Sequence, residues 1–312
     1  MPDQSLFEWE FAKKPNTFVV GAPKCGTTAM CDYLAQHPQV FMSKPKEPHF
    51  FVGSEMPGKA RVFAEEERYA RLFDEVEDGH RIVAEGSVWY LYSQTALRNI
   101  SRFQPDSRII VMLRRPDEMV YSMHNEAVAN FSEDILNFDQ AWNTALAGNV
   151  RISWSDLCDE RSKLDYHRIA MYSEQITRIY KYFPKQQVKV IFYDDFKFDT
   201  KICFEDVLNF LELNSIDVNL SKINQSRVVS NRALGRFLRK PPPTVMKISR
   251  IVKELMHVDK LGWRDRLESR NSYVQSREPI NPSTRAEIIC HYRSDVITLG
   301  EMCNRDLSHW LE

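Results

Sequence analysis

The stretch that decides the fold runs from Phe18 to Pro38 and reads FVVGAPKCGTTAMCDYLAQHP. An apolar run is followed by a loop with two glycines, and then by a segment whose apolar residues recur with a helical period. A strand, a glycine-containing loop and a helix start, in that order, direct backbone N–H groups and the positive end of the helix dipole at an anion. The stretch therefore predicts an anion-binding turn between a buried strand and a helix, with Thr27 or Thr28 as the N-cap.

Four apolar runs, separated by helical patterns, extend this unit along the chain. They cover residues 17–22, 81–87, 108–113 and 188–193. Because their hydrophobicity is continuous and does not alternate, we expect strands that are buried on both faces, as in a parallel sheet covered by helices. The expected fold is α/β, a three-layer sandwich with a central parallel sheet flanked by helices, of the kind seen in P-loop nucleotide-binding proteins. One domain over residues 1–312 is the expected organisation.

Local signals predict where helices begin. Ser93 is expected to cap one helix, and Pro116 is expected in the first turn of another, followed by two acidic residues that suit the helix dipole. Ser283 or Thr284 is expected to cap the last helix. The basic stretch 232–247 contains three consecutive prolines and is expected to break regular structure, which makes residues 228–275 a candidate lid.

Composition excludes several classes of partner. The chain has 42 Lys and Arg against 43 Asp and Glu, a net charge of −1, so no global positive field attracts nucleic acid or an anionic membrane. Six cysteines lack any C-x-x-C pair, which indicates reduced thiols and predicts neither a zinc site nor a disulfide framework. With no leader-like segment and no apolar run of about 18 residues, we expect a cytoplasmic protein without a metal; the oligomeric state is left open.

The loop differs from a Walker A loop, G-x-x-x-x-G-K-[ST], in the place of its lysine. Lys24 precedes Gly26, and Thr27 and Thr28 follow that glycine directly. In a P-loop NTPase the lysine follows the second glycine and a Ser or Thr ligates magnesium. The metal is needed because of the charge of the triphosphate. The arrangement here favours a smaller anionic group held without a metal. An ordinary β-to-α turn with a surface lysine is the alternative that motif frequency alone favours.

Several segments, taken in order, resemble the sulfotransferase family that uses 3′-phosphoadenosine-5′-phosphosulfate (PAPS), and in particular its heparan-sulfate-type branch and bacterial relatives. They are GAPKCGTTAMCDYLAQHP with SKPKEPHFF, EGSVWYL (85–91), RIIVMLRRPDEMVYSMHNE, VKVIFYDDF and HYRSDVITLGEMCNRDLSHWL. The resemblance implies transfer of the sulfuryl group of PAPS to a hydroxyl or amine, with release of adenosine 3′,5′-bisphosphate.

The same resemblance implies a set of residues that bind the cofactor: Lys24, Cys25, Gly26, Thr27, Thr28, Arg114 and Ser122. Lys24 would lie beside the bridging oxygen, where an ammonium stabilises negative charge more in the transition state than in the ground state. Arg114 directly follows an apolar strand, and its guanidinium suits phosphate oxygens. Arg115 is expected to face solvent.

The segment SKPKEPHFF supplies the predicted acid–base chemistry. Without the resemblance it reads as a solvated charged loop. The resemblance implies that Glu47 is the general base, that Lys44 lies near the sulfuryl oxygens and that His49 lines the site. A nearby lysine keeps the pKa of a carboxyl low, so Glu47 would accept a proton and not donate one. His49 is the rival base, and the sequence leaves that choice open.

One departure from the family pattern bears on the acceptor. Gly86 stands where the glycan-modifying relatives carry an active-site lysine, which favours a small-molecule acceptor such as a natural product. A glycan sulfotransferase is the alternative. Glu85, Ser87 and Tyr90 are candidates to line the acceptor pocket, and packing in the core is an equal alternative for Trp89 and Tyr90.

Two rivals come from other classes. An ATP- and magnesium-dependent kinase would need a carboxylate at a strand end, for which Asp194 and Asp195 are weak candidates. A catalytically silent nucleotide-binding protein would bind the bisphosphate without turnover.

Overall fold

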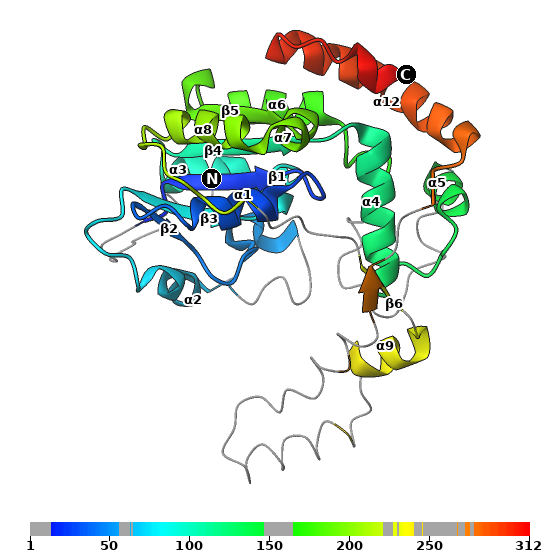
Figure 1. Ribbon diagram of the computed structural model, residues 1–312, viewed down its shortest axis with the longest axis horizontal. Helices are drawn as coiled ribbons and strands as arrows, with labels where there is room; N and C mark the ends of the chain where they lie inside the picture. Colours follow the sequence, from blue (N-terminus) through cyan, green and yellow to red (C-terminus); the bar gives the residue numbers. More distant parts are fainter. Residues whose placement is uncertain are drawn as a thin grey trace.

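A five-stranded parallel sheet in the order β2-β3-β1-β4-β5 forms the centre of the protein (Figure 1). The computed structural model describes residues 14–55, 63, 65–146, 165–220, 227–229, 231–239, 245, 267, 272–274 and 278–312. The strands of the central sheet are β1 (Thr17–Gly21), β2 (Val40–Met42), β3 (Ile82–Gly86), β4 (Arg108–Leu113) and β5 (Val188–Phe192). The expected α/β fold is therefore confirmed.

The buried strands explain the continuous apolar runs. All five residues of β1 are buried, and so are all of β3 and every residue of β4 after the first. Four of the five strands match the predicted runs to within one residue at each end. The strand β2 was not predicted, because a three-residue strand is too short to show a pattern.

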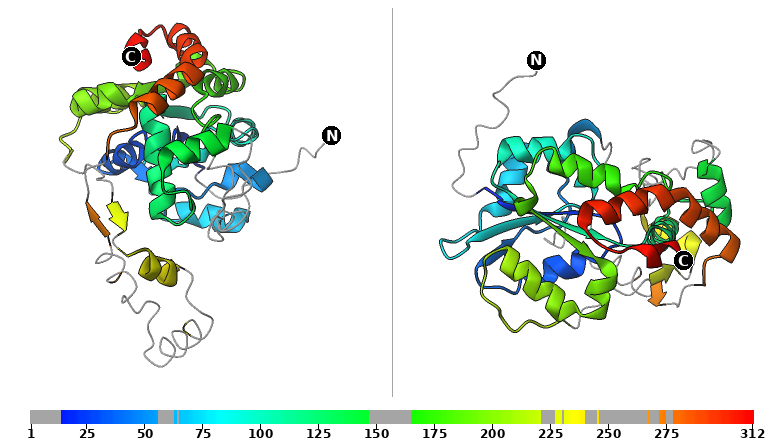
Figure 2. Two further views of the ribbon diagram at one scale, coloured as in Figure 1. Left: turned by 90° about the vertical axis from the view of Figure 1, so that its right-hand side faces the viewer. Right: turned by 90° about the horizontal axis from the view of Figure 1, so that it is seen from above.

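Helices cover both faces of the sheet. The helices of the described residues are α1 (Thr27–Leu34), α2 (Glu66–Ala70), α3 (Ala96–Phe103), α4 (Pro116–Ala129), α5 (Phe138–Leu146), α6 (Tyr172–Tyr180), α7 (Tyr193–Phe198), α8 (Thr200–Phe210), α9 (Arg232–Arg239) and α12 (Pro282–Cys303), and not all of them contact the sheet. Viewed along the sheet, α1 and α8 lie on one side and α3 and α6 on the other (Figure 2). Tyr33 of α1 and Phe204 of α8 confirm the first pairing, since their ring centroids are 6.0 Å apart.

The C-terminal helix α12 joins α4 and α6 on the outside of this sandwich (Figure 1). Asp295 of α12 accepts hydrogen bonds from the amides of Tyr172 and Ser173, at 2.8 and 3.0 Å, and so caps the start of α6. After α12, Trp310 is 1% exposed, and its ring meets that of Phe192 on β5. The C-terminal segment is thus part of the core.

The predicted helix starts are partly right. Pro116 lies in the first turn of α4, followed by Asp117 and Glu118, as expected. The N-cap of α3 is Thr95, so the prediction of Ser93 was wrong by two residues, although Ser93 Oγ accepts a hydrogen bond from the Ala96 amide at 2.9 Å. The N-cap of α12 is Asn281, so the prediction of Ser283 or Thr284 was wrong. Pro282 occupies the first helical position, which places the cap one residue before it.

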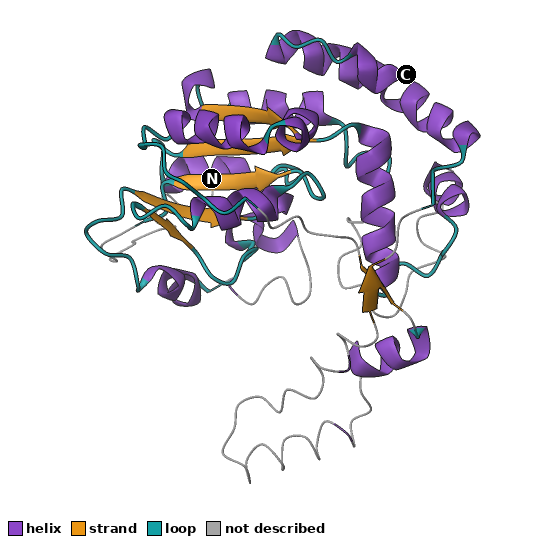
Figure 3. Cartoon of the chain, in the orientation of Figure 1, coloured by secondary structure: helices purple, strands orange, loops and turns teal. Residues whose placement is uncertain are grey.

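The region after residue 220 holds a two-stranded antiparallel sheet, β6 (Arg227–Val229) and β7 (Ser272–Val274), and the helix α9. These elements lie apart from the central sheet, beyond one end of α4 (Figure 3). Residues 232–239 form α9, so the prediction that this stretch breaks regular structure was wrong for its first half. Residues 240–247, apart from residue 245, and most of the candidate lid at 228–275 lie outside the described residues.

Candidate active site

Residues that follow four different strands meet at the carboxyl edge of the sheet, where ligands of open α/β sheets bind. The Glu47 amide donates to Gly86 O at 2.9 Å, and the His49 amide donates to Ser87 Oγ at 3.1 Å, which joins the turn after β2 to the end of β3. Arg114, after β4, donates from Nη1 to Lys24 O at 3.5 Å, which joins it to the loop after β1. The parallel register therefore gathers predicted residues that are distant in sequence.

The loop after β1 ends on Gly26, which is the N-cap of α1 with φ of 89°. The prediction of Thr27 or Thr28 as the cap was wrong, because the chain turns into the helix through a left-handed conformation that glycine adopts without cost. No side chain caps α1 within the described part of the chain, so its first-turn amides are available to an anion. A Cβ at Gly26 would lie 3.2 Å from the Tyr193 ring, so glycine also allows that ring to approach.

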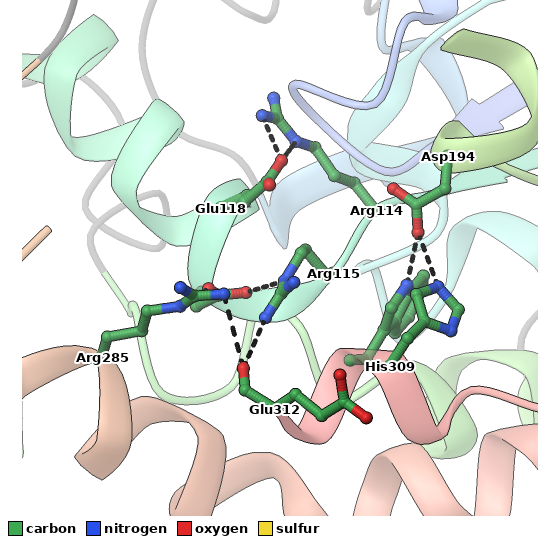
Figure 4. A network of polar contacts seen from close by, with 9 residues as sticks. Arg114, Arg115, Glu118, Asp194, Arg285, His309 and Glu312 are labelled. Carbon is green, nitrogen blue, oxygen red and sulfur yellow. Dashed lines mark hydrogen bonds and ion pairs between the residues drawn. The ribbon is translucent and has the colours of Figure 1, made fainter. Parts of the chain in front are cut away.

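Lys24 and Arg114 supply the positive charge beside this helix start. Lys24 Nζ lies 3.2 Å from Glu126 Oε1. Arg114 donates from Nε and Nη2 to Glu118 Oε2, at 2.8 and 2.6 Å (Figure 4). The Arg114 guanidinium also lies over the ring of Tyr193, 4.8 Å from its centroid. Each cation is thus paired with a glutamate of α4.

The other predicted cofactor residues lie in or beside the same loop and on α4. Cys25 is fully buried, its Sγ donates to Pro23 O at 3.3 Å, and burial raises the pKa of this thiol to about 12. Thr27 is buried and Thr28 is partly exposed at the start of α1. Ser122 lies on the buried face of α4, 1% exposed. Their assignment to the cofactor stays a prediction.

The turn after β2 holds the predicted base in an ion-paired cluster. Lys46 Nζ lies 2.8 Å from Glu47 Oε1, and His49 Nε2 lies 3.4 Å from Glu47 Oε2. Burial alone would raise the pKa of Glu47, but the His49 hydrogen bond and the Lys46 charge together lower it to about 2. Glu47 is therefore an ionised carboxylate at neutral pH, in direct contact with His49, and the choice between them as base stays a prediction. Lys44 is exposed on the same turn, and its predicted role stays a prediction.

The backbone at these positions is strained. Lys24, Glu47 and His49 have φ values of 62°, 66° and 54°, in the left-handed region that residues with a Cβ rarely adopt. Such conformations cost on the order of 1–3 kcal/mol each and concentrate at functional sites. Among the described residues, Phe131, Glu212 and Asn304 also have positive φ, but only at this edge do three such residues lie in two loops that meet, which supports it as the candidate site.

Behind the turn lies a buried carboxyl. Glu85 on β3 is fully buried and accepts hydrogen bonds from the hydroxyls of Tyr69 and Tyr90, both at 2.9 Å, and from Ser87 Oγ. Burial outweighs these hydrogen bonds and raises the pKa of Glu85 to about 7. The expectation that Glu85, Ser87 and Tyr90 line a pocket was wrong. They are buried in the core, and Ser87 positions the His49 amide from behind.

Arg115 does not face solvent as expected, because its side chain, only 13% exposed, is ion-paired in a second cluster. Arg115 and Arg285 donate to the two carboxylate oxygens of Asp117, at 2.7 and 2.9 Å, and Asp117 is 2% exposed (Figure 4). Both arginines also donate to the backbone oxygen of Glu312. This cluster anchors α12 and the last residue to the loop after β4.

The strand-end carboxylates considered for a kinase are engaged elsewhere. Asp194 accepts from Trp310 Nε1 at 2.5 Å and lies 3.2 Å from His309 Nε2 (Figure 4). Asp195 pairs with Arg305 at 2.6 Å. Over the described ranges, no three His, Cys, Asp or Glu side chains are grouped so as to hold a metal ion.

The sequence reasoning gave no role to four residues that contact the predicted site residues: Lys46, Glu118, Glu126 and Tyr193. Tyr193 directly follows β5, so the rule that ligands bind at carboxyl strand ends was a usable signal. Lys46 precedes the predicted base, but only the folded turn shows that it, and not Lys44, contacts Glu47. The two glutamates belong to a helix whose rotation about its axis the sequence does not specify.

Comparisons with known proteins indicate the same family that the sequence motifs resemble. A family model described as a sulfotransferase domain matches residues 14–236. Human carbohydrate sulfotransferase 15 is 25% identical over an alignment of 284 residues, and the match covers 76% of this chain and 51% of that protein. Human heparan sulfate glucosamine 3-O-sulfotransferase 3B1 is 27% identical over 189 residues, 60% of this chain and 43% of that protein. The chain thus spans about half the length of these curated relatives.

Among solved structures, a sulfotransferase from Alicyclobacillus acidocaldarius superposes with a TM-score of 0.69 at 25% identity, over 96% of this chain and 100% of that chain. No helix in the described part of the protein has both the length and the apolar composition that crossing a membrane requires.

Proposed function

The chain belongs to the sulfotransferase domain family, and from that premise we propose that it moves a sulfuryl group from PAPS to a hydroxyl or amine of a small-molecule acceptor. The family that the sequence motifs indicated is thereby confirmed. The observation that carries the proposal is the meeting of an uncapped helix start, Lys24 and an ionised Glu47 at one edge of the sheet, with strained backbone on both sides.

The residues present fit the donor. The amides at the start of α1, with Lys24, suit the 5′-phosphosulfate, because an anion is stabilised there by N–H groups, the helix dipole and an ammonium. Arg114, partly buried against Tyr193, suits the second phosphate, because a guanidinium binds phosphate oxygens with fixed geometry. When bound, PAPS supplies an activated sulfuryl group whose leaving oxygen gains negative charge.

The protein side chains then do three things. Glu47 takes the proton of the acceptor hydroxyl or amine, whose lone pair forms the new bond to sulfur, while the electrons of the broken S–O bond stay on the released bisphosphate. His49 holds Glu47 in place through the 3.4 Å contact. Lys24 stabilises the charge of the leaving oxygen, a contribution of about 3 kcal/mol by comparison with other oxyanion donors.

The nature of the acceptor rests on Gly86. A Cβ at this position would lie 2.7 Å from Cys31 Sγ, so a lysine here would require the Cys31 side chain to move. We infer a small-molecule acceptor, such as a natural product, that does not need this extra cation. A glycan is the second candidate, because the curated relatives are named for carbohydrate and heparan sulfate.

The cellular compartment is inferred from the cysteines. The cysteines that the structure describes, at positions 25, 31, 203, 290 and 303, are all free thiols. Free thiols are typical of reducing compartments and support a cytoplasmic protein.

Two measurements test the function. Isothermal titration without magnesium should show binding of adenosine 3′,5′-bisphosphate. Lys24→Met should weaken this binding and lower sulfuryl transfer by about 10²–10³-fold, measured as bisphosphate release over a panel of small-molecule and glycan acceptors. Lys189→Met is the matched control, since it removes a lysine that pairs with Asp206 on the outer strand β5.

Binding of ATP only with magnesium, or unchanged turnover in Lys24→Met, would overturn the proposal. Sulfation confined to glycans would overturn the choice of acceptor.

A further inference from the structure

The lysine that lies deepest between the two site loops is Lys46. Its Nζ lies 2.8 Å from Glu47 Oε1 and 3.5 Å from Thr27 Oγ1, so it connects the predicted base to the first residue of α1. Its side chain is 22% exposed, against 28% for Lys24. A lysine in this position faces both the anion-binding helix start and the proton acceptor.

The stem of Lys46 occupies space that a side chain at Gly86 would need. A Cβ built on Gly86 would lie 3.5 Å from Lys46 Cε and 3.8 Å from Lys46 Cγ, in van der Waals contact. The same Cβ would lie 2.7 Å from Cys31 Sγ, so glycine leaves room here for both Cys31 and the Lys46 stem. Gly86 therefore provides the surface across which the aliphatic part of Lys46 reaches α1, while its ammonium stays polar.

We propose that Lys46 is a second cation for the transferred sulfuryl group, placed on the acceptor side of the site, and that Gly86 is the residue that admits it. The proposal rests on the proposed function. Lys24 would face the leaving oxygen in the loop after β1, and Lys46 would face the sulfuryl oxygens from beside Glu47. Lys46 keeps its proton throughout and acts by charge alone.

The contacts of Lys46 explain how its ammonium can both hold Glu47 and stabilise the sulfuryl oxygens. While Glu47 is ionised, Lys46 holds it at 2.8 Å in a charge-assisted hydrogen bond. Once Glu47 takes the acceptor proton, that hydrogen bond weakens, and the charge of Lys46 becomes available to the sulfuryl oxygens when they need it most. The charged and titratable groups around Glu47 are Lys46 and His49 on its own turn, Cys31 on α1 and Glu85 on β3.

The test separates binding of the donor from binding of the product. PAPS carries the sulfuryl group and adenosine 3′,5′-bisphosphate lacks it, so a residue that contacts only this group affects only the donor. Isothermal titration without an acceptor should show Lys46→Met weakening PAPS binding about tenfold, the loss expected for one hydrogen bond to a charged group. Bisphosphate affinity should stay within about twofold of the wild type.

Comparison variants sharpen the result. Lys46→Arg keeps the charge and should retain PAPS affinity to within about threefold, and Lys189→Met should bind both ligands as the wild type does. Gly86→Val in a Cys31→Ala background should reproduce the loss seen in Lys46→Met, because the added methyl groups displace the lysine stem, while Cys31→Ala alone should not.

Equal effects of Lys46→Met on donor and product, or no effect on either, would overturn the role of Lys46. Normal PAPS affinity in the Gly86→Val double variant would overturn the role of Gly86. A wild-type protein that binds neither ligand would instead show that the proposed function itself is wrong.

Discussion

Substituting Glu118 by glutamine should tighten the binding of adenosine 3′,5′-bisphosphate. In the protein without ligand, Glu118 Oε2 accepts two hydrogen bonds from Arg114, at 2.8 and 2.6 Å. If Arg114 binds a phosphate of the cofactor, as we propose, the carboxylate competes with that phosphate for the same donors and repels it. The variant removes the repulsion and keeps an oxygen that can accept a hydrogen bond.

The magnitude follows from exposure and distance. The side chains of Arg114 and Glu118 are 17% and 41% exposed, and a partly exposed ion pair contributes at most about 1 kcal/mol. Coulomb's law at an effective dielectric constant of about 20 gives roughly 3 kcal/mol for unit charges about 6 Å apart. Solvent screening of a partly exposed carboxylate leaves about 1 kcal/mol, or roughly a fivefold gain in affinity.

Isothermal titration of the bisphosphate at low and at high salt provides the assay. The gain should shrink at high salt, because it arises from charge repulsion at a partly exposed site. Glu212→Gln is the matched control, since Glu212 pairs with Arg108 at the opposite end of the same strand β4. Unchanged or weaker binding in Glu118→Gln, with wild-type binding in the control, would refute the assignment of Arg114 to the phosphate.

Two further predictions concern stability. The folded-state pKa of Glu85 is raised from 4.5 to about 7, so this carboxyl stabilises the fold while it is protonated, and roughly 3 kcal/mol should be lost as the pH rises from about 4.5 through 7. Denaturant melts at about pH 5 and pH 8 should show this loss in the wild type and not in Glu85→Gln; equal slopes in both proteins would contradict it. Asp117→Asn should lower the free energy of unfolding by about 3 kcal/mol, because it leaves the guanidinium groups of Arg115 and Arg285 around a buried neutral amide; a thermal melt within about 1 °C of the wild type would show that the pairs contribute little.

Local patterns predicted features that depend on neighbours in sequence. Continuous apolar runs predicted buried parallel strands, and the start of α4 was readable because Pro116 and the acidic residues after it act within a single turn. The helix caps show where local patterns no longer suffice. Gly26 caps α1 in place of a threonine because the turn from β1 requires a positive φ, which depends on how the helix packs against the sheet.

Part of the candidate site could be predicted from the sequence, and part could not. Lys24, Glu47, His49 and Arg114 were predicted from motif positions, and the parallel register brings the loops that carry them together. Arg115 was wrongly expected to be exposed, because the helix that covers it is distant in sequence. Arg285 of that helix shares the carboxylate of Asp117 with Arg115 and lies 168 residues beyond Asp117. Nothing in the order of residues near Arg115 indicates that α12 will cover it.

By itself, the order of residues determined that this chain folds as a parallel α/β sheet with a glycine-containing turn into a helix after its first strand, because hydrophobic period and the conformational freedom of glycine act over a few residues. Only the tertiary structure decided which charges meet: Lys46 with Glu47 across Gly86, Arg114 with Glu118, and Asp117 with Arg285. The physical reason is that an ion pair forms within about 4 Å. Such distances depend on how whole helices and strands pack, and a local pattern does not record that packing.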